Sequence, residues 1–246
     1  MKRKKNWEPI NNTELISECP NWQKVRDNES SKKEEAKKEI KKLKARTPNQ
    51  NTYMNAISSC TLTMCAGVAG TGKTFIACAM GAEYLMDAKV ERIIITRPIV
   101  ECGQKLGFLP GTLSEKTDPY MMPMFDSFKD FLNEEQFAKM LADKIIEIVP
   151  LEIMRGRTFH NCFIILDEAQ NATKKQMRMF LTRFGENSKI VICGDATQSD
   201  LPHADGNPLL WIMDRLVHVD IASVLLGPED IQRHGLIRYI LERIGE

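Results

Sequence analysis

The sequence lacks the features that mark several large classes of protein. No apolar run in its 246 residues approaches the roughly 18 residues of a membrane-spanning helix. The basic residues 2–5 are followed by polar sequence and not by the apolar core of a secretion signal. The seven cysteines form no C-x-x-C pair, so we expect reduced packing residues in place of a disulfide or zinc site. These absences predict a cytoplasmic protein with no membrane partner.

A strong overall charge is also missing, because the formal net charge is only +1. That balance hides an asymmetry: residues 1–46 carry 14 Lys/Arg and 8 Asp/Glu, whereas residues 47–246 carry 20 and 25. Basic character is therefore confined to the first 46 residues, and no pattern of interleaved aromatic and basic residues marks a groove for single-stranded nucleic acid. The composition is otherwise that of a soluble globule, with 43% apolar and 27% charged residues and enough length for one substantial domain.

The most specific motif present is a phosphate-binding loop at residues 67–74. The pattern G-x-x-x-x-G-K-[ST] is filled by Gly67, Val68, Ala69, Gly70, Thr71, Gly72, Lys73 and Thr74. Its glycines allow several backbone N–H groups to converge on a phosphate, Lys73 reaches the β- and γ-phosphate oxygens, and the Thr74 hydroxyl ligates Mg²⁺. A β-branched, apolar run at 61–66 precedes the loop, and a helical pattern that begins at about residue 73 runs to residue 87 after it. The sequence therefore predicts a site for a nucleoside triphosphate.

Three further segments supply candidates for the rest of a hydrolysis site. The apolar run 163–166 ends in Asp167, expected to hold Mg²⁺, and in Glu168, expected to orient and deprotonate the attacking water. Gln198 follows the apolar run 189–193, where it is placed to contact the γ-phosphate or that water. Gln50, in a predicted helix at 47–57, could pair its amide with the edge of adenine.

The order of these segments predicts the fold. Apolar strands alternate with helices, and the site residues follow the carboxyl ends of strands, which indicates an α/β fold with a parallel, RecA-like sheet flanked by helices. We expect a basic helical arm at residues 1–46, whose helix spans 29–46, and an ATPase domain at 47–246. Within that domain we expect a long insertion at 97–158 between core strands, a last strand at 217–226 and a terminal helix at 228–244.

Taken in order, the motifs resemble the PhoH-like ATPase family, in the compact form found in bacteriophages. The resemblance covers about residues 47–246 and rests on the segments 67–74, 96–98, 106–111, 154–158, 164–170, 179–183, 194–198 and 230–234. It implies a RecA-like core related to superfamily 1 helicases, with ATP and Mg²⁺ as cofactors. It further implies a homo-oligomeric, hexameric ring that acts on RNA or another single-stranded nucleic acid, in the host cytoplasm where the protein is phage-encoded.

A superfamily 1 helicase completes its ATP site with arginines from a second RecA domain, for which this chain has no room. The arginine is therefore expected from a neighbouring subunit or from the C-terminal segment, with Arg233 as first candidate, Arg183 as second, and Arg155 or Arg157 as third. Arg97 follows the apolar run 92–96 and could contact a nucleic-acid backbone or form an internal salt bridge.

Three functions remain open on the sequence. The first is an ATPase whose cycle remodels nucleic acid, most readily RNA. The second is a small-molecule phosphotransferase, which fits less well because the acid pair and Gln198 suit the activation of water. The third is a nucleotide-gated binding or assembly protein with slow turnover, favoured by the acidic balance of residues 47–246.

Overall fold

The computed structural model describes residues 43–98, 124–195, 206–232 and 243. The chain divides into two units, residues 1–40 and 41–246, and every described residue lies in the second. The predicted domain boundary between residues 46 and 47 stays a prediction.

The centre of the described fold is one six-stranded sheet in which every pairing is parallel. Its strands are β1 (Leu62–Gly67), β2 (Arg92–Thr96), β3 (Ile146–Ile148), β4 (Cys162–Leu166), β5 (Lys189–Gly194) and β6 (Ile221–Leu226). Their spatial order is β3-β2-β4-β5-β1-β6. Because β5 lies between β1 and β4, the carboxyl ends of three strands with predicted site residues meet at one edge of the sheet.

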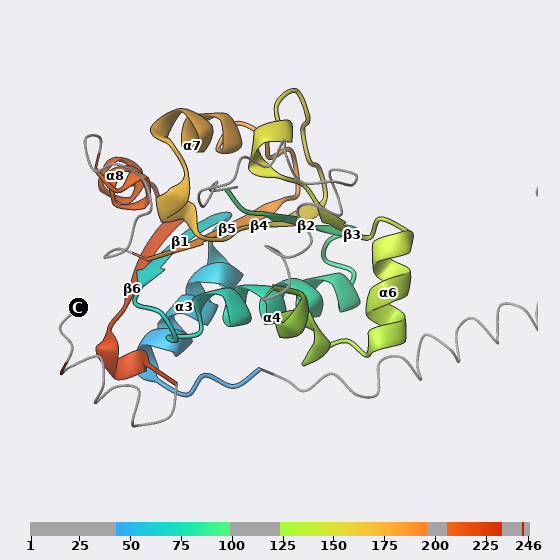
Figure 1. Cartoon of the computed structure of the whole chain (residues 1–246), viewed down its shortest axis with the longest axis horizontal. Helices are drawn as coiled ribbons and strands as arrows, with labels where there is room; N and C mark the ends of the chain where they lie inside the picture. The colour runs from blue at the N-terminus through green and yellow to red at the C-terminus, as the bar shows by residue number, and fades with distance from the viewer. Residues whose placement is uncertain (1–42, 99–123, 196–205, 233–242, 244–246) are drawn as a thin grey trace, which may run out of the picture. The chain divides into compact units, whose positions relative to one another are not determined.

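Helices cover both faces of the sheet (Figure 1). One face carries α3 (Pro48–Ser59), α4 (Lys73–Met86) and α6 (Glu134–Ala142), and the other carries α7 (Lys174–Phe180) and α8 (Pro208–Arg215). Side chains alternate between the two apolar cores: Ile93 and Ile95 of β2 pack into the first, and Ile94 packs into the second. Burial on both faces explains why these strands appear in the sequence as continuous apolar runs.

Local sequence sets the ends of several helices. The hydroxyl of Thr47 accepts a hydrogen bond from the Gln50 N–H, and Pro48 occupies the first turn of α3. Thr173 and Gln176 form a reciprocal capping box at the start of α7. The predicted strands and helices around the phosphate loop are confirmed to within one or two residues.

Three expectations about the connecting segments were wrong. The predicted insertion at 97–158 contains a strand of the sheet itself, β3, which pairs with β2 at one edge. The described residues that end the predicted arm helix, 43–46, are not helical. The predicted terminal helix at 228–244 is wrong at its start, which is a short 3-10 turn, Pro228–Asp230, followed by two non-helical residues, whereas residue 243 is helical as predicted.

The cysteines of the described residues bear out the packing role. Cys65, Cys78, Cys162 and Cys193 are buried free thiols, and Cys60 is partly buried. Burial raises the pKa of the Cys193 thiol to about 12, with the nearby Asp167 carboxylate acting in the same direction. Within the described residues, no helix is both long and apolar enough to cross a bilayer.

Candidate nucleotide-binding site

The phosphate loop leaves β1 and enters α4 through two glycine positions that admit no other residue easily. At Gly67 a Cβ atom would lie 2.6 Å from the Leu226 carbonyl oxygen, so the close approach of β6 requires glycine. Gly72 has a φ of 86°, in the left-handed region, immediately before the first helical residue, Lys73. This turn directs the amino end of α4 toward the loop, which suits an anion.

The Lys73 ammonium lies across this loop. Its Nζ donates hydrogen bonds to the carbonyl oxygens of Gly67 at 2.6 Å and Val68 at 2.9 Å. The Thr71 hydroxyl also donates to the Val68 carbonyl, at 2.9 Å, which closes the loop on itself. The loop is therefore preformed, and the Lys73 ammonium is held against the first two residues of the loop.

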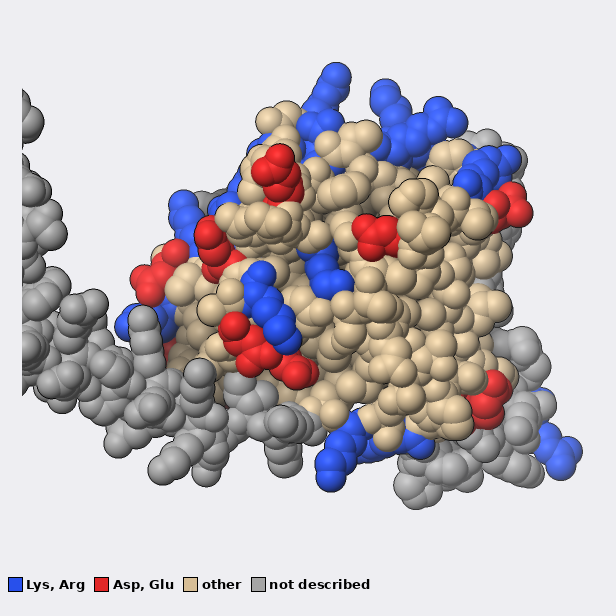
Figure 2. Space-filling view, turned by 180° about the vertical axis from the view of Figure 1, so that it is seen from behind, with Lys and Arg blue, Asp and Glu red and all other residues tan. Residues whose placement is uncertain are grey.

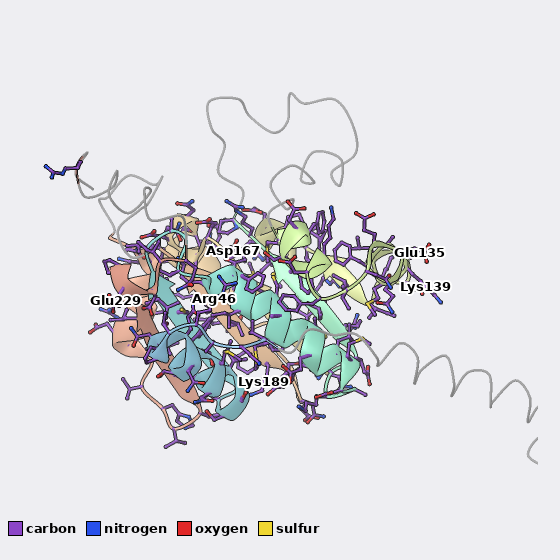
Figure 3. All side chains as sticks on the ribbon, turned by 90° about the horizontal axis from the view of Figure 1, so that it is seen from below. Arg46, Glu135, Lys139, Asp167, Lys189 and Glu229 are labelled. Carbon is purple, nitrogen blue, oxygen red and sulfur yellow. The ribbon has the colours of Figure 1, made fainter. Side chains whose placement is uncertain are left out.

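Asp167 lies beside the first turn of α4, as Figure 3 shows. The Thr74 hydroxyl donates to its Oδ1 at 2.6 Å, although 93 residues separate the two in the sequence. Asp167 is only 5% exposed. Burial raises the pKa of its carboxyl group, the neighbouring Glu168 charge raises it further, and the Thr74 hydrogen bond opposes both. Two hard oxygen ligands thus stand together in a site that disfavours an uncompensated negative charge, which fits a divalent cation.

We expect Asp167→Asn to stabilise the nucleotide-free protein at pH 8. The raised folded-state pKa means that the folded protein holds this proton to a higher pH than the unfolded chain. The protein therefore loses stability as pH rises from the unfolded-state pKa, near 3.9, through the folded-state pKa. Above both pKa values the full cost of the buried carboxylate is present. Removing the charge with Asn should raise the melting temperature by about 2–4 °C for each kcal/mol gained in the free energy of unfolding.

Thermal melts in EDTA at pH 8 and pH 4 test this expectation. The gain should shrink at pH 4, because the folded protein then holds more of this proton than at pH 8 and the unfolded chain is about half protonated. Asp143→Asn, at an exposed position after α6, is the matched control and should leave the melting temperature unchanged. A lower melting temperature for Asp167→Asn at pH 8 would show that the carboxylate stabilises the fold.

Glu168 is held between two partners at the end of β4. Arg97 Nη2 lies 3.5 Å from one carboxylate oxygen, and the Gln170 amide donates to the other. Glu168 itself adopts a left-handed conformation, with φ 51° and ψ 42°, which turns the chain sharply after the strand. Of the two alternatives for Arg97, the internal salt bridge is the one present in the structure.

Gln170 is a site residue that the sequence motifs did not predict. It is 3% exposed, and while its Nε2 donates to Glu168, its Oε1 accepts from the Asp195 N–H at 2.8 Å. Asp195 follows β5 directly, so one buried amide joins the candidate base to the end of the neighbouring strand. Gln198, predicted to contact the γ-phosphate, lies outside the described residues. The position of Gln170, a polar residue two places after Glu168, is the only feature of the sequence that could have indicated its role.

Gln50 contacts the phosphate loop from α3. Its Nε2 donates to the Thr71 carbonyl at 3.0 Å, and its Oε1 accepts from the Arg46 N–H at 2.9 Å. The side chain is only 4% exposed, so Gln50 supports the phosphate loop from the protein interior. Its pairing with adenine stays a prediction.

The segment after β6 returns to the same loop. Asp230 is fully buried, accepts hydrogen bonds from Thr47, Asn49 and the Gly227 N–H, and has a lowered pKa because these bonds outweigh its burial. Two residues later, the Gln232 N–H donates to the Gly70 carbonyl at 3.0 Å. The next residue, Arg233, lies outside the described residues.

The other candidate arginines differ in how they are engaged. The Arg183 guanidinium donates to the Met179 carbonyl and the Thr182 hydroxyl, at the end of α7. Arg157 forms a two-pronged pair with Glu147, at 2.7 and 2.9 Å. Arg155 is exposed. Arg155 is thus the described candidate with the most exposed side chain, and the assignment of the finger stays a prediction.

A cavity of about 260 Å³ lies between the phosphate loop, the acid pair Asp167–Glu168 and the end of β5. It is lined by Ala69, Gly70, Gly72, Lys73, Thr74, Phe75, Asp167, Glu168, Gly194 and Asp195. The loop, the acid pair and the end of β5 thus meet at one place, as the sequence predicts.

Comparison with known proteins identifies relatives across most of the chain. A sequence model for PhoH-like protein matches residues 42–244. The chain is 46% identical over 207 residues to the PhoH-like protein of Mycobacterium leprae, covering 84% of this chain and 59% of that one. It is 42% identical over 200 residues to protein PhoH of Escherichia coli, covering 80% and 56%. The chain therefore spans little more than half the length of these curated relatives.

Among solved structures, the large terminase of a thermophilic bacteriophage superposes with a TM-score of 0.53 at 10% identity, covering 81% of this chain and 50% of the terminase. The same terminase in complex with ADP gives 0.51 at 11% identity, with the same coverage. At this identity the likeness shows the fold alone. That fold is the RecA-like P-loop arrangement that the sequence predicts.

Proposed function

Because the chain belongs to the family of PhoH-like proteins, we propose that it is a Mg²⁺-dependent ATPase that couples hydrolysis to the remodelling of RNA as an oligomeric ring. The convergence of four side chains carries the catalytic half of this function. Lys73, Thr74, Asp167 and Glu168 come from two segments more than 90 residues apart and line a single cavity. A phosphate loop facing an acid pair in this way is the arrangement that phosphoryl transfer to water requires.

Binding begins at the phosphate loop. Its backbone N–H groups and the amino end of α4 face the phosphates, and Lys73 exchanges a carbonyl partner for a phosphate oxygen. Thr74 and Asp167 are the residues that would hold Mg²⁺, because their oxygens already lie within 2.6 Å of each other. When bound, Mg²⁺ neutralises charge on the phosphates and compensates the buried Asp167 carboxylate.

Hydrolysis then depends on Glu168. Its carboxylate takes a proton from a water molecule as the oxygen of that water attacks the γ-phosphorus, and the bond to the bridging oxygen of ADP breaks. Arg97 and Gln170 fix the carboxylate in the required direction, since each contacts a different oxygen. Gln170 also ties that carboxylate to Asp195, so a movement after β5 is transmitted to the base.

The RNA and ring components are supported by other observations. The family resemblance implies both, and the basic residues 1–46 supply a positively charged segment in a chain whose remaining residues are acidic on balance. A nucleotide-gated assembly protein is the second candidate, because residues 47–246 carry five more acidic than basic residues. A phosphotransferase is the weaker alternative, since the described cavity lining pairs the loop with acids suited to water activation.

Mass in solution and phosphate release, each with and without single-stranded RNA, separate these functions. We expect an oligomer whose ATP hydrolysis is accelerated by RNA. A protein whose mass responds to ATP while its hydrolysis stays near zero with every nucleic acid would contradict the remodelling function and favour gated assembly. Transfer of phosphate to an added small molecule, with none released to water, would instead identify a phosphotransferase.

A further inference from the structure

A cluster of basic and aromatic side chains forms where α7 and α8 lie on one face of the sheet. Its members come from two separate segments of the sequence. It consists of Trp211, Lys174, Arg178 and Arg215, and is called here the Trp211 patch. The two helices share an apolar core through Met177, Phe180, Leu209 and Ile212, and Trp211 packs partly buried against that core. The patch therefore stands on a packed apolar scaffold.

Three cations surround the single indole ring. Lys174 Nζ lies 5.7 Å from the ring centroid, Arg178 Cζ 5.3 Å and Arg215 Cζ 5.4 Å. Lys174 and Arg178 stand one turn apart on α7, so they share a face of that helix. Each cation is within range of the ring's attractive quadrupole, but the three positive charges repel one another. A bound anion relieves that repulsion.

Helix α7 and the turns on either side of it contribute no acid to the patch. Residues 169–185 contain four Lys/Arg and no Asp or Glu, within a domain whose net charge is negative. Arg215 has a carboxylate partner, Asp214, at 3.3 Å. Within the described parts of the chain, no carboxylate lies within ion-pair distance of Lys174 or Arg178. Figure 2 shows Lys and Arg side chains gathered along the upper edge of the molecule, the edge at which α7 lies in Figure 1.

Both helices of the patch are joined to the candidate catalytic residues. The start of α7 follows Gln170 by four residues, and Gln170 holds Glu168. The residue that caps α8, Asn207, donates from its side chain to the Asp195 carbonyl at 2.9 Å. A ligand that shifts α7 or α8 therefore acts on the two groups that Gln170 connects.

We propose that the Trp211 patch binds single-stranded nucleic acid. Lys174, Arg178 and Arg215 move from the ring to the flanking phosphates, and a base stacks on the indole in their place. This inference rests on the proposed function, for which the Trp211 patch is the point of contact with RNA. An unpaired strand fits better than a duplex, because only an unstacked base offers its face to an aromatic ring. An aromatic ring among cations also fits a nucleic acid better than an acidic peptide, which offers charge without a stacking partner.

Fluorescence anisotropy of a labelled oligouridine RNA of about 15 nucleotides tests the patch on the full-length protein. We expect Trp211→Ala to weaken binding by about 5- to 150-fold, and Trp211→Phe to restore most of it. The double variant Lys174→Gln/Arg178→Gln should lower the slope of log affinity against log salt by about 0.7 for each phosphate that the two side chains no longer neutralise. The matched control, Lys89→Gln/Lys139→Gln, removes two charges elsewhere and should leave the slope unchanged.

Basal ATP hydrolysis, measured without RNA, reports on folding and separates the possible failures. If every variant binds RNA as the wild type does, the patch is not the point of contact, although the proposed function stands. If the wild type hydrolyses ATP but binds neither RNA nor single-stranded DNA, both the patch and the RNA half of the proposed function are wrong. If polyglutamate binds as tightly as RNA, Lys174→Gln/Arg178→Gln weakens both and Trp211→Ala changes neither, the patch is an electrostatic site for an acidic protein and base stacking is wrong.

Discussion

Glu168→Gln should bind ATP with nearly unchanged affinity but hydrolyse it about 10²–10⁴ times more slowly, which is the usual contribution of a positioned general base. The substitution keeps the shape of the side chain and removes its ability to take a proton from water. It leaves the phosphate loop and the Thr74–Asp167 pair intact. Binding of a fluorescent ATP analogue and release of phosphate measure the two effects separately.

The matched control is Glu135→Gln, an exposed substitution in the first turn of α6 (Figure 3). It should leave both ATP affinity and turnover within about twofold of the wild type, since surface substitutions remote from a site have small effects. Turnover of Glu168→Gln close to that of the wild type would mean that another residue activates water. Loss of ATP binding would mean that the carboxylate supports the loop instead.

Arg233→Ala should lower turnover by about 10³-fold or more while ATP still binds, if Arg233 is the arginine that stabilises the transition state. The residue before it, Gln232, donates to the Gly70 carbonyl of the same chain, and Asp230 anchors the segment beneath α3. This attachment to its own phosphate loop leads us to propose that Arg233 acts within its own subunit. Arg233→Lys, which keeps the charge but loses the planar fork, should recover only part of the rate.

Mixed oligomers distinguish an arginine that acts in its own subunit from one that acts on a neighbour. When Arg233→Ala protein is combined with Lys73→Ala protein, an arginine acting in its own subunit predicts no recovery of hydrolysis. An arginine acting on the neighbouring subunit predicts recovery, because a Lys73→Ala subunit can then complete the site of an Arg233→Ala subunit. Recovery would therefore contradict the proposed arrangement.

The sequence predicted the parts of the fold in which one local pattern determines the structure. Continuous apolar runs mark strands that are buried on both faces, and the glycines of the phosphate loop are required by its backbone. β3 escaped prediction because it has only three residues, one of which is the charged Glu147. A short edge strand depends on pairing with β2, and its own sequence does not specify that pairing.

Site features that depend on distant segments could not be read from the sequence. Gln170 joins Glu168 to Asp195, which lies 25 residues further along the chain than Gln170. The Trp211 patch combines residues of α7 and α8, whose positions in the sequence suggest no stacking pattern. In both cases the packing of separate elements on the sheet brings the side chains together.

The most direct test of the account is the rate of phosphate release from ATP by the purified wild-type protein, with Mg²⁺ and with EDTA, beside Lys73→Ala. We predict release that requires Mg²⁺ and that Lys73→Ala abolishes, because the loop cation and the Thr74–Asp167 pair act on the same phosphates. Wild-type release that is no faster than that of Lys73→Ala, or that is unaffected by EDTA, would contradict hydrolysis at this site.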